Sequence, residues 1–167
     1  MSANMTRVKA SSNFLALDQS LNTSGWAVYK EGHLANSGTF TTDKKSDEGS
    51  KIGEIFIWLC SMHNEYEFDR VVFEDVQNQQ NENTYKKLSR VQGAIIAWCE
   101  IQGVDYDIVA PSHWRSVLGG SWGRKREEQK QHAIEYVKDV LDKDVSSDEA
   151  DALCIGLSFI KEDNSAW

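Results

Sequence analysis

Residues 14–28 read FLALDQSLNTSGWAV, and this stretch decides how the fold is expected to begin. Asn13–Asp18 is apolar between two polar ends, which is typical of a strand buried on both faces. A polar turn follows, and Gly25–Lys30 and His33–Thr41 then alternate apolar and polar side chains on either side of Gly32. That alternation predicts a β-hairpin. We therefore expect a buried strand followed by an antiparallel pair.

Strands and helices alternate along the rest of the chain. Apolar residues recur every three or four positions in the expected helices, whereas short apolar runs mark the expected strands. After the hairpin we expect helix Ser46–Tyr66, strand Arg70–Val76, helix Thr84–Gln102, strand Asp105–Val109, a helix that starts at Pro111, and helices Glu127–Leu141 and Ser147–Ile160. This order predicts the α/β class: a mixed sheet, with an antiparallel hairpin meander followed by parallel strands, and helices on both faces.

Length and composition indicate a single folded domain. The chain has 167 residues, 40% of them hydrophobic, which is enough to build a core and too apolar for a disordered chain. Because there is no internal repeat or linker, we expect one domain at 13–162 after a disordered lead at 1–12. No apolar run approaches the ~20 residues of a membrane span. No glycine-rich phosphate-binding motif is present, so we expect no nucleotide cofactor.

The cysteines indicate a reducing compartment. Cys60, Cys99 and Cys154 lie far apart in apolar helical stretches. An odd number of cysteines without a CxxC spacing favours reduced thiols over disulfides or a zinc site. We therefore expect a cytoplasmic protein.

Charge is distributed unevenly along the chain. The formal net charge of −8 counts against binding to duplex DNA, because duplex-binding proteins usually present a basic face. Ser112–His132, however, contains five basic residues against the acidic Glu127 and Glu128. The basic residues are Arg115, Arg124, Lys125, Arg126 and Lys130. A solvated loop is the simpler explanation of this segment. Trp114 and Trp122 bracket it and could stack on bases, although Trp114 fits the core equally well.

Two acidic residues at the start of the last expected helix share one face. Ser146 and Glu149 match a capping box, which places the helix start near Ser147. Asp148 and Asp151 are then three residues apart on the same side. The helix dipole explains Asp148 alone, but Asp151 precedes the apolar run ALCIGLSFI. A carboxylate buried there needs a partner, and a cation is the partner that tolerates a second carboxylate beside it.

Acidic residues also end two of the expected strands. Asp18 ends the first strand, and Glu74 and Asp75 end another, where α/β sheets bind ligands. Turn initiation explains Asp18 equally well, and a helix cap or a surface ion pair explains the other two. Because adjacent strand residues point to opposite faces, Glu74 and Asp75 cannot both join Asp18, and the residues alone do not show which does. Together the carboxylates predict a Mg²⁺ or Mn²⁺ site suited to two-metal phosphodiester cleavage.

Over Phe14–Phe159 the chain resembles the RuvC family of Holliday-junction resolvases, which have a ribonuclease H-like fold. The resemblance rests on FLALDQSLNTSGWAV, VVFEDV and the terminal DEADALCIGL. It implies a catalytic, metal-binding tetrad made of Asp18, Glu74, Asp148 and Asp151. It therefore selects Glu74 over Asp75. It also implies Mg²⁺ as the cofactor, with Mn²⁺ able to substitute, and a homodimer with a helix like Thr84–Gln102 at its interface.

The same resemblance assigns the basic segment to branched DNA. The implied DNA-binding residues are Arg115, Arg124, Lys125, Arg126 and Lys130. Each dimer would carry two active sites and cut symmetric strands of a four-way junction. One departure is segment 77–85, QNQQNENTY, which has no aromatic residue before Tyr85, whereas cellular resolvases often carry one there. In this respect the chain looks like the small phage-encoded members, which accept varied branched DNA, so a bacterial or phage-infected cell is the expected setting.

We therefore expect a structure-selective endodeoxyribonuclease that resolves four-way (Holliday) junctions and related branched DNA. Metal-dependent hydrolysis would leave 5′-phosphate and 3′-hydroxyl ends. Two alternatives are a ribonuclease H that cleaves the RNA of RNA–DNA hybrids and a catalytically silent junction-binding module. The four acids argue against the silent module, because a site that has lost catalysis gains nothing from four carboxylates that repel one another.

Overall fold

The strands and helices follow the order that the hydrophobic pattern predicts. The computed structural model describes residues 13–77 and 81–165, and the expected lead at 1–12 lies outside them. The strands are β1 (Phe14–Asp18), β2 (Thr23–Lys30), β3 (His33–Thr41), β4 (Arg70–Glu74) and β5 (Asp105–Val109). The helices are α1 (Glu48–Tyr66), α2 (Glu82–Gln102), α3 (Pro111–Leu118), α4 (Arg126–Leu141) and α5 (Ser147–Ser165). The expected elements are all present, and their ends differ from the expected ones by a few residues.

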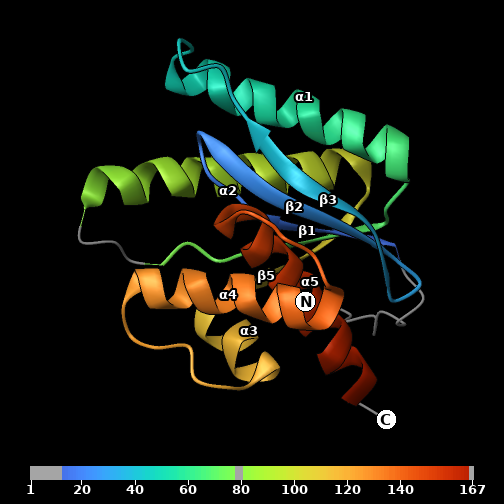
Figure 1. Ribbon diagram of the computed structural model, residues 1–167. Coiled ribbons are helices and arrows are strands. Elements are labelled where there is room, and N and C mark those ends of the chain that lie inside the picture. The colour runs from blue at the N-terminus through green and yellow to red at the C-terminus, as the bar shows by residue number, and fades with distance from the viewer. Residues whose placement is uncertain (1–12, 78–80, 166–167) are drawn as a thin grey trace, which may run out of the picture.

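The strands form one mixed sheet in the order β3-β2-β1-β4-β5. β1, β2 and β3 are antiparallel neighbours, whereas β4 runs parallel to β1 and β5 runs parallel to β4. Figure 1 shows this sheet between two helical layers, with α1 and α2 on one side and α3, α4 and α5 on the other. The prediction of a hairpin meander followed by parallel strands, with helices on both faces, is confirmed.

Side chains alternate between the two helical layers along β1 and β4. Ala16 and Val72 are paired across these strands, and both pack into the core beneath α4 and α5. The next pair along the strands packs into the opposite core, against α1 and α2. Successive strand residues point to opposite faces of the sheet. Asp18 and Glu74 each lie two residues after Ala16 and Val72, so they point to the same α5 side, whereas Asp75 points to the other side. Strand pairing therefore places Glu74, and not Asp75, on the same side of the sheet as Asp18.

Two glycines let α5 pack closely on the sheet. A Cβ atom added to Gly25 of β2 would stand 1.8 Å from the carbonyl oxygen of Asp148, and one added to Gly156 would stand 2.1 Å from the ring of Tyr29. Both distances are far below van der Waals contact, so neither position has room for a side chain. The Tyr29 hydroxyl also donates a hydrogen bond to the carbonyl oxygen of Leu153 at 2.8 Å. These contacts set the depth at which α5 lies on β2.

The start of α5 differs in one respect from the expected capping box. The helix begins at Ser147, as predicted, and the hydroxyl of Ser146 accepts a hydrogen bond from the backbone amide of Glu149 at 3.3 Å. The reciprocal bond is absent from the described residues, so the prediction of a full box is wrong. Instead the Glu149 carboxylate accepts a hydrogen bond from the hydroxyl of Ser37 in β3 at 2.7 Å. Glu149 therefore ties the helix to the sheet instead of capping its own backbone.

All three cysteines of the chain are free thiols, and Cys99 and Cys154 are buried. Among the described residues, no helix combines the length and the apolar character that crossing a membrane requires.

Candidate active site

Four carboxylates approach one another where β1 and β4 end and α5 begins. Asp18 and Glu74 are the last residues of these two neighbouring parallel strands. Asp18 pairs with Gly25 across β1 and β2, and Gly25 in turn lies against the backbone of Asp148. Asp151 follows Asp148 on the same side of α5. Strand pairing and one glycine contact therefore bring acidic residues from distant parts of the chain to one place.

The acids lie close enough together for their charges to change the pKa values of Asp18 and Asp151. Burial raises the pKa of Asp18 well above its ordinary value, and the charges of neighbouring acids raise this pKa further, in the order Glu74, Asp151 and Asp148. Burial, followed by the charge of Glu74, raises the pKa of Asp151 to about 7. Burial also raises the pKa of Glu74, although a hydrogen bond from Trp114 opposes this rise. Negative charge is therefore unfavourable here unless a cation balances it.

No direct ion pair within the described residues neutralises this charge. Within the described residues, no ion pair reaches any of the four carboxylates. Nor does a hydrogen bond from this part of the chain reach the side chain of Asp18, Asp148 or Asp151. Arg70, at the opposite end of β4, shows the contrast, because this buried side chain is paired with two aspartates of β5. A buried acidic cluster that forms no ion pair among the described residues fits a divalent metal ion.

The donor atoms suit a hard cation. Carboxylate oxygens are the ligands that Mg²⁺ and Mn²⁺ prefer. Among the described residues, no three acidic, histidine or cysteine side chains already converge to hold an ion. Two buried atoms beside the cluster also have no partner in this part of the structure: Gln19 Oε1, an acceptor, and Arg115 Nε, a donor. A phosphate oxygen could accept a hydrogen bond from Arg115 Nε.

Glutamine side chains continue the strand pairing beyond the last paired residues. Gln19 Nε2 donates a hydrogen bond to the main-chain carbonyl of Glu74 at 2.6 Å. Because a carbonyl can only accept, this bond assigns the amide orientation and leaves Oε1 as the unpartnered atom. Gln92 of α2 accepts a hydrogen bond from the amide of Val76 at 3.0 Å. The sequence gives no sign of either contact, because Gln19 looks like an ordinary polar turn residue.

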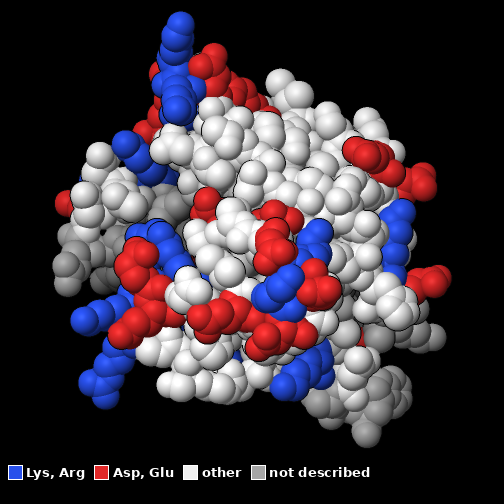
Figure 2. Space-filling view, in the orientation of Figure 1, with Lys and Arg blue, Asp and Glu red and all other residues white. Residues whose placement is uncertain are grey.

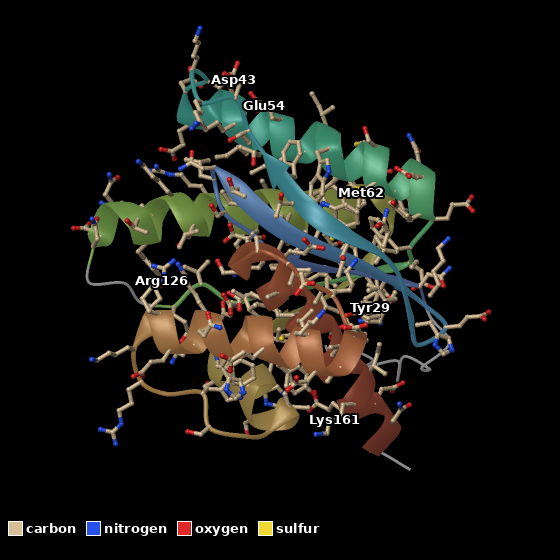
Figure 3. The ribbon with its side chains drawn as sticks, in the orientation of Figure 1. Tyr29, Asp43, Glu54, Met62, Arg126 and Lys161 are labelled. Carbon is tan, nitrogen blue, oxygen red and sulfur yellow. The ribbon has the colours of Figure 1, made fainter. Side chains whose placement is uncertain are left out.

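Arg115, Arg126 and Lys130 lie near the acidic cluster. In Figure 3, Arg126 rises from the start of α4 toward the sheet, and its charge lowers the pKa of Asp18. Arg115 and Lys130 likewise lower the pKa of Asp151. These residues form no ion pair with the cluster, so they add positive potential around it and keep their hydrogen-bonding capacity for another anion.

Arg124 and Lys125 are exposed just before α4. Their backbone amides donate hydrogen bonds to the Glu128 carboxylate at 3.1 and 3.0 Å, which caps the start of the helix. Figure 2 shows basic and acidic side chains intermixed over the α4 side of the molecule. Three of the five candidate DNA contacts, Arg115, Arg126 and Lys130, therefore lie near the acids, and Arg126 is exposed to solvent like Arg124 and Lys125.

The prediction that the tryptophans around the basic segment stack on bases is wrong. Trp114 is 1% exposed and Trp122 is 9% exposed, so neither ring offers a stacking surface. The alternative placement of Trp114 in the core is confirmed. Its indole Nε1 donates a hydrogen bond to Glu74 Oε1 at 3.0 Å. No sequence signal indicates this bond, because the two residues belong to different elements.

Acid titration of the metal-free protein is expected to reveal the carboxylate repulsion. The pKa values of Asp18 and Asp151 are higher in the folded protein than in the unfolded chain. These two carboxyl groups therefore contribute most to stability below the ordinary aspartate pKa of about 4. The contribution is lost as the pH rises through their folded-state pKa values. In EDTA, we expect the unfolding temperature to fall between about pH 5 and about pH 8. Calorimetry across this range, with Mg²⁺ restoring the loss, is the measurement. A flat profile would contradict the clustering.

A family model described as crossover junction endodeoxyribonuclease RuvC matches residues 14–159 of the chain. The chain belongs to the RuvC family. This RuvC-family chain is 27% identical over 157 residues to the crossover junction endodeoxyribonuclease RuvC of Nitratidesulfovibrio vulgaris (strain DP4), a match that covers 92% of the chain and 93% of the relative. It is 29% identical over 124 residues to that of Dictyoglomus thermophilum, which covers 74% of the chain and 77% of the relative.

Solved structures show the same fold. One is Thermus thermophilus RuvC in complex with a Holliday junction substrate, with a TM-score of 0.76 and 16% identity over 92% of this chain and 96% of that one. Another is the yeast mitochondrial Holliday junction resolvase, with a TM-score of 0.63 and 12% identity over 95% of this chain and 82% of that one. The ribonuclease H-like architecture is confirmed. Family membership makes the chain a crossover junction endodeoxyribonuclease, an enzyme class of DNA recombination and repair.

Proposed function

We propose that Asp18, Glu74, Asp148 and Asp151 bind the divalent cations with which this RuvC-family chain cleaves four-way DNA junctions. One observation carries the assignment: the charges of the neighbouring acids raise the pKa values of Asp18 and Asp151, and no ion pair among the described residues reaches the four carboxylates. RuvC-family enzymes typically use Mg²⁺, and the oxygen donors fit Mg²⁺ or Mn²⁺.

The residues of the site would have different roles in hydrolysis. Bound Mg²⁺ would supply positive charge to the scissile phosphate and lower the pKa of a water molecule. Asp18 and Asp151 would share one ion, while Glu74 and Asp148 complete the site. The unpartnered Nε of Arg115 is free to donate a hydrogen bond to a phosphate oxygen.

Basic residues around the cluster would hold the DNA backbone. Arg126 and Lys130 already lie near the acids, so they would contact the strand that is cut. Arg124 and Lys125 face solvent and would contact flanking phosphates. Such contacts position the junction without reading its sequence.

The chain would act as a homodimer that cuts two strands of one junction. α2 is the proposed interface, and it presents Tyr85 and Ile101 to solvent, at 39% and 68% exposure. Ile101 is suited to burial between subunits, whereas Tyr85 lies on nearly the opposite side of the helix. A pair of sites related by two-fold symmetry would match the symmetric strands of a four-way junction.

A panel of substrates tests the proposal. We expect purified protein to make paired, symmetric incisions in a four-way junction with Mg²⁺ or Mn²⁺, fewer in a Y-shaped substrate, and none in linear duplex. The products are expected to carry ligatable 5′-phosphate ends. Cleavage of an RNA–DNA hybrid but not of the junction would indicate a ribonuclease H. Metal-independent binding without any cleavage would indicate a silent module, and single unpaired nicks would contradict the dimer.

A further inference from the structure

Glu74 is the one tetrad carboxylate that a described side chain holds directly. Trp114 Nε1 donates a hydrogen bond to Glu74 Oε1 at 3.0 Å, from α3 to the end of β4. The indole is buried, at 1% exposure. A neutral N–H donor occupies one carboxylate oxygen without cancelling the charge, so the other oxygen stays available to a cation.

An aromatic layer fixes the position of the Trp114 ring. Trp122 meets it edge to face, with ring centroids 5.2 Å apart, and donates its own indole N–H to the carbonyl of Gly119 at 3.0 Å. His132 of α4 packs against Trp122 with centroids 4.2 Å apart. Because Trp114 is held by these contacts, its N–H direction is set before any ligand arrives.

Two further contacts converge on the same residues. The guanidinium of Arg115 lies over the Trp114 ring, 4.8 Å from its centroid, and this charge lowers the pKa of Glu74. Gln19 holds the main-chain carbonyl of Glu74 from the β1 side. Glu74 is therefore held at its backbone by one residue and at its side chain by another.

We propose that Trp114 is a positioning residue that orients the Glu74 carboxylate for a divalent cation. The proposal rests on the function proposed above, because it takes Glu74 as a ligand. Ligand-orienting hydrogen bonds of this kind typically change metal affinity or activity by about 10- to 100-fold when they are removed.

Replacing Trp114 by phenylalanine tests the proposal, because Trp114→Phe removes the N–H donor and keeps an aromatic ring. Two titrations with Mg²⁺ are measured: the rise in unfolding temperature, which reports ion binding without catalysis, and the single-turnover rate of junction cleavage. We expect the half-maximal Mg²⁺ concentration to rise by about tenfold or more in both, with a much smaller fall in the rate at saturating Mg²⁺. Benzothienylalanine at position 114, which replaces only the N–H by sulfur, is expected to reproduce this shift if the phenylalanine variant folds poorly.

Trp98→Phe is the matched control. Trp98 is also fully buried, and its indole donates to Cys60 Sγ at 3.3 Å, but it lies in the core on the other side of the sheet. This variant is expected to titrate like the wild type. In a Glu74→Gln background, Trp114→Phe is expected to cause no further shift, because the two residues act together.

The outcomes separate the two proposals. A wild-type protein that shows neither a Mg²⁺-dependent stabilisation nor Mg²⁺-dependent cleavage would refute the metal site itself. If the wild type shows both, and the position-114 variants titrate like it, the positioning role of Trp114 is overturned. An equal shift in the presence and absence of the Glu74 carboxylate would also overturn it, since Trp114 would then act only through packing.

Discussion

Asp18→Asn is expected to slow Mg²⁺-dependent junction cleavage by at least about a thousandfold, which corresponds to roughly 4 kcal/mol of transition-state stabilisation. Burial and the charges of the other three acids raise the pKa of Asp18 well above its ordinary value. A neutral amide cannot balance a divalent cation. Junction binding in EDTA is expected to be unchanged or tighter, because one negative charge that repels phosphate has been removed. Single-turnover cleavage and electrophoretic mobility shifts measure the two effects separately.

Asp75→Asn is the control for that experiment. It makes the same chemical change next to Glu74, on a residue that the strand pleat directs away from the cluster, and it is expected to cut at close to the wild-type rate. Asp151→Asn is expected to behave like Asp18→Asn. Near-wild-type cutting by either cluster variant, or an equal loss in Asp75→Asn, would show that the site has been placed wrongly.

Gly25→Ala is expected to damage both stability and cleavage. The added Cβ would stand 1.8 Å from the carbonyl oxygen of Asp148, so β2 and the start of α5 must separate. Overpacking of this kind costs about 1–3 kcal/mol, or roughly 2–4 °C in unfolding temperature per kcal/mol for a chain of this size. The shift also moves two carboxylates, and a displacement of ~1 Å can reduce catalysis by about 100-fold. Thermal unfolding and single-turnover cleavage are the measurements.

Gly53→Ala provides the comparison. Gly53 lies in α1, and a Cβ atom added there meets nothing within 4 Å. We expect full activity and a gain of about 0.4–1 kcal/mol, because alanine restricts the unfolded chain. If Gly25→Ala were as stable and as active as Gly53→Ala, the start of α5 would not be held against β2 as described.

Much of the fold could be predicted from the sequence because its signals are local. The apolar run that ends in Asp18, the turn at Gly32 and the helical spacing in α1 and α2 each reflect burial of one face, and the structure confirms the elements they predict. The choice between Glu74 and Asp75 was different. It depends on which strand residue is level with Ala16, and pairing register is a property of two strands, not of one segment.

The contacts that shape the site could not be predicted for the same reason. Trp114 and Glu74 are brought together by packing of α3 under the sheet, and nothing in either segment specifies the other. The side chain of Glu149 has a local partner within reach, yet it bonds to Ser37. Sequence periodicity reports how much of a side chain is buried, whereas hydrogen-bond partners depend on tertiary structure.

The path of the chain through the sheet has a consequence during synthesis. β1 and β4 leave the ribosome long before α5, yet the cluster includes two acids from α5. A nascent or prematurely ended chain that lacks this helix would have only two of the four proposed ligands, Asp18 and Glu74. If the four acids bind the cation as proposed, the chain becomes able to cut DNA only when its final helix has docked on the sheet.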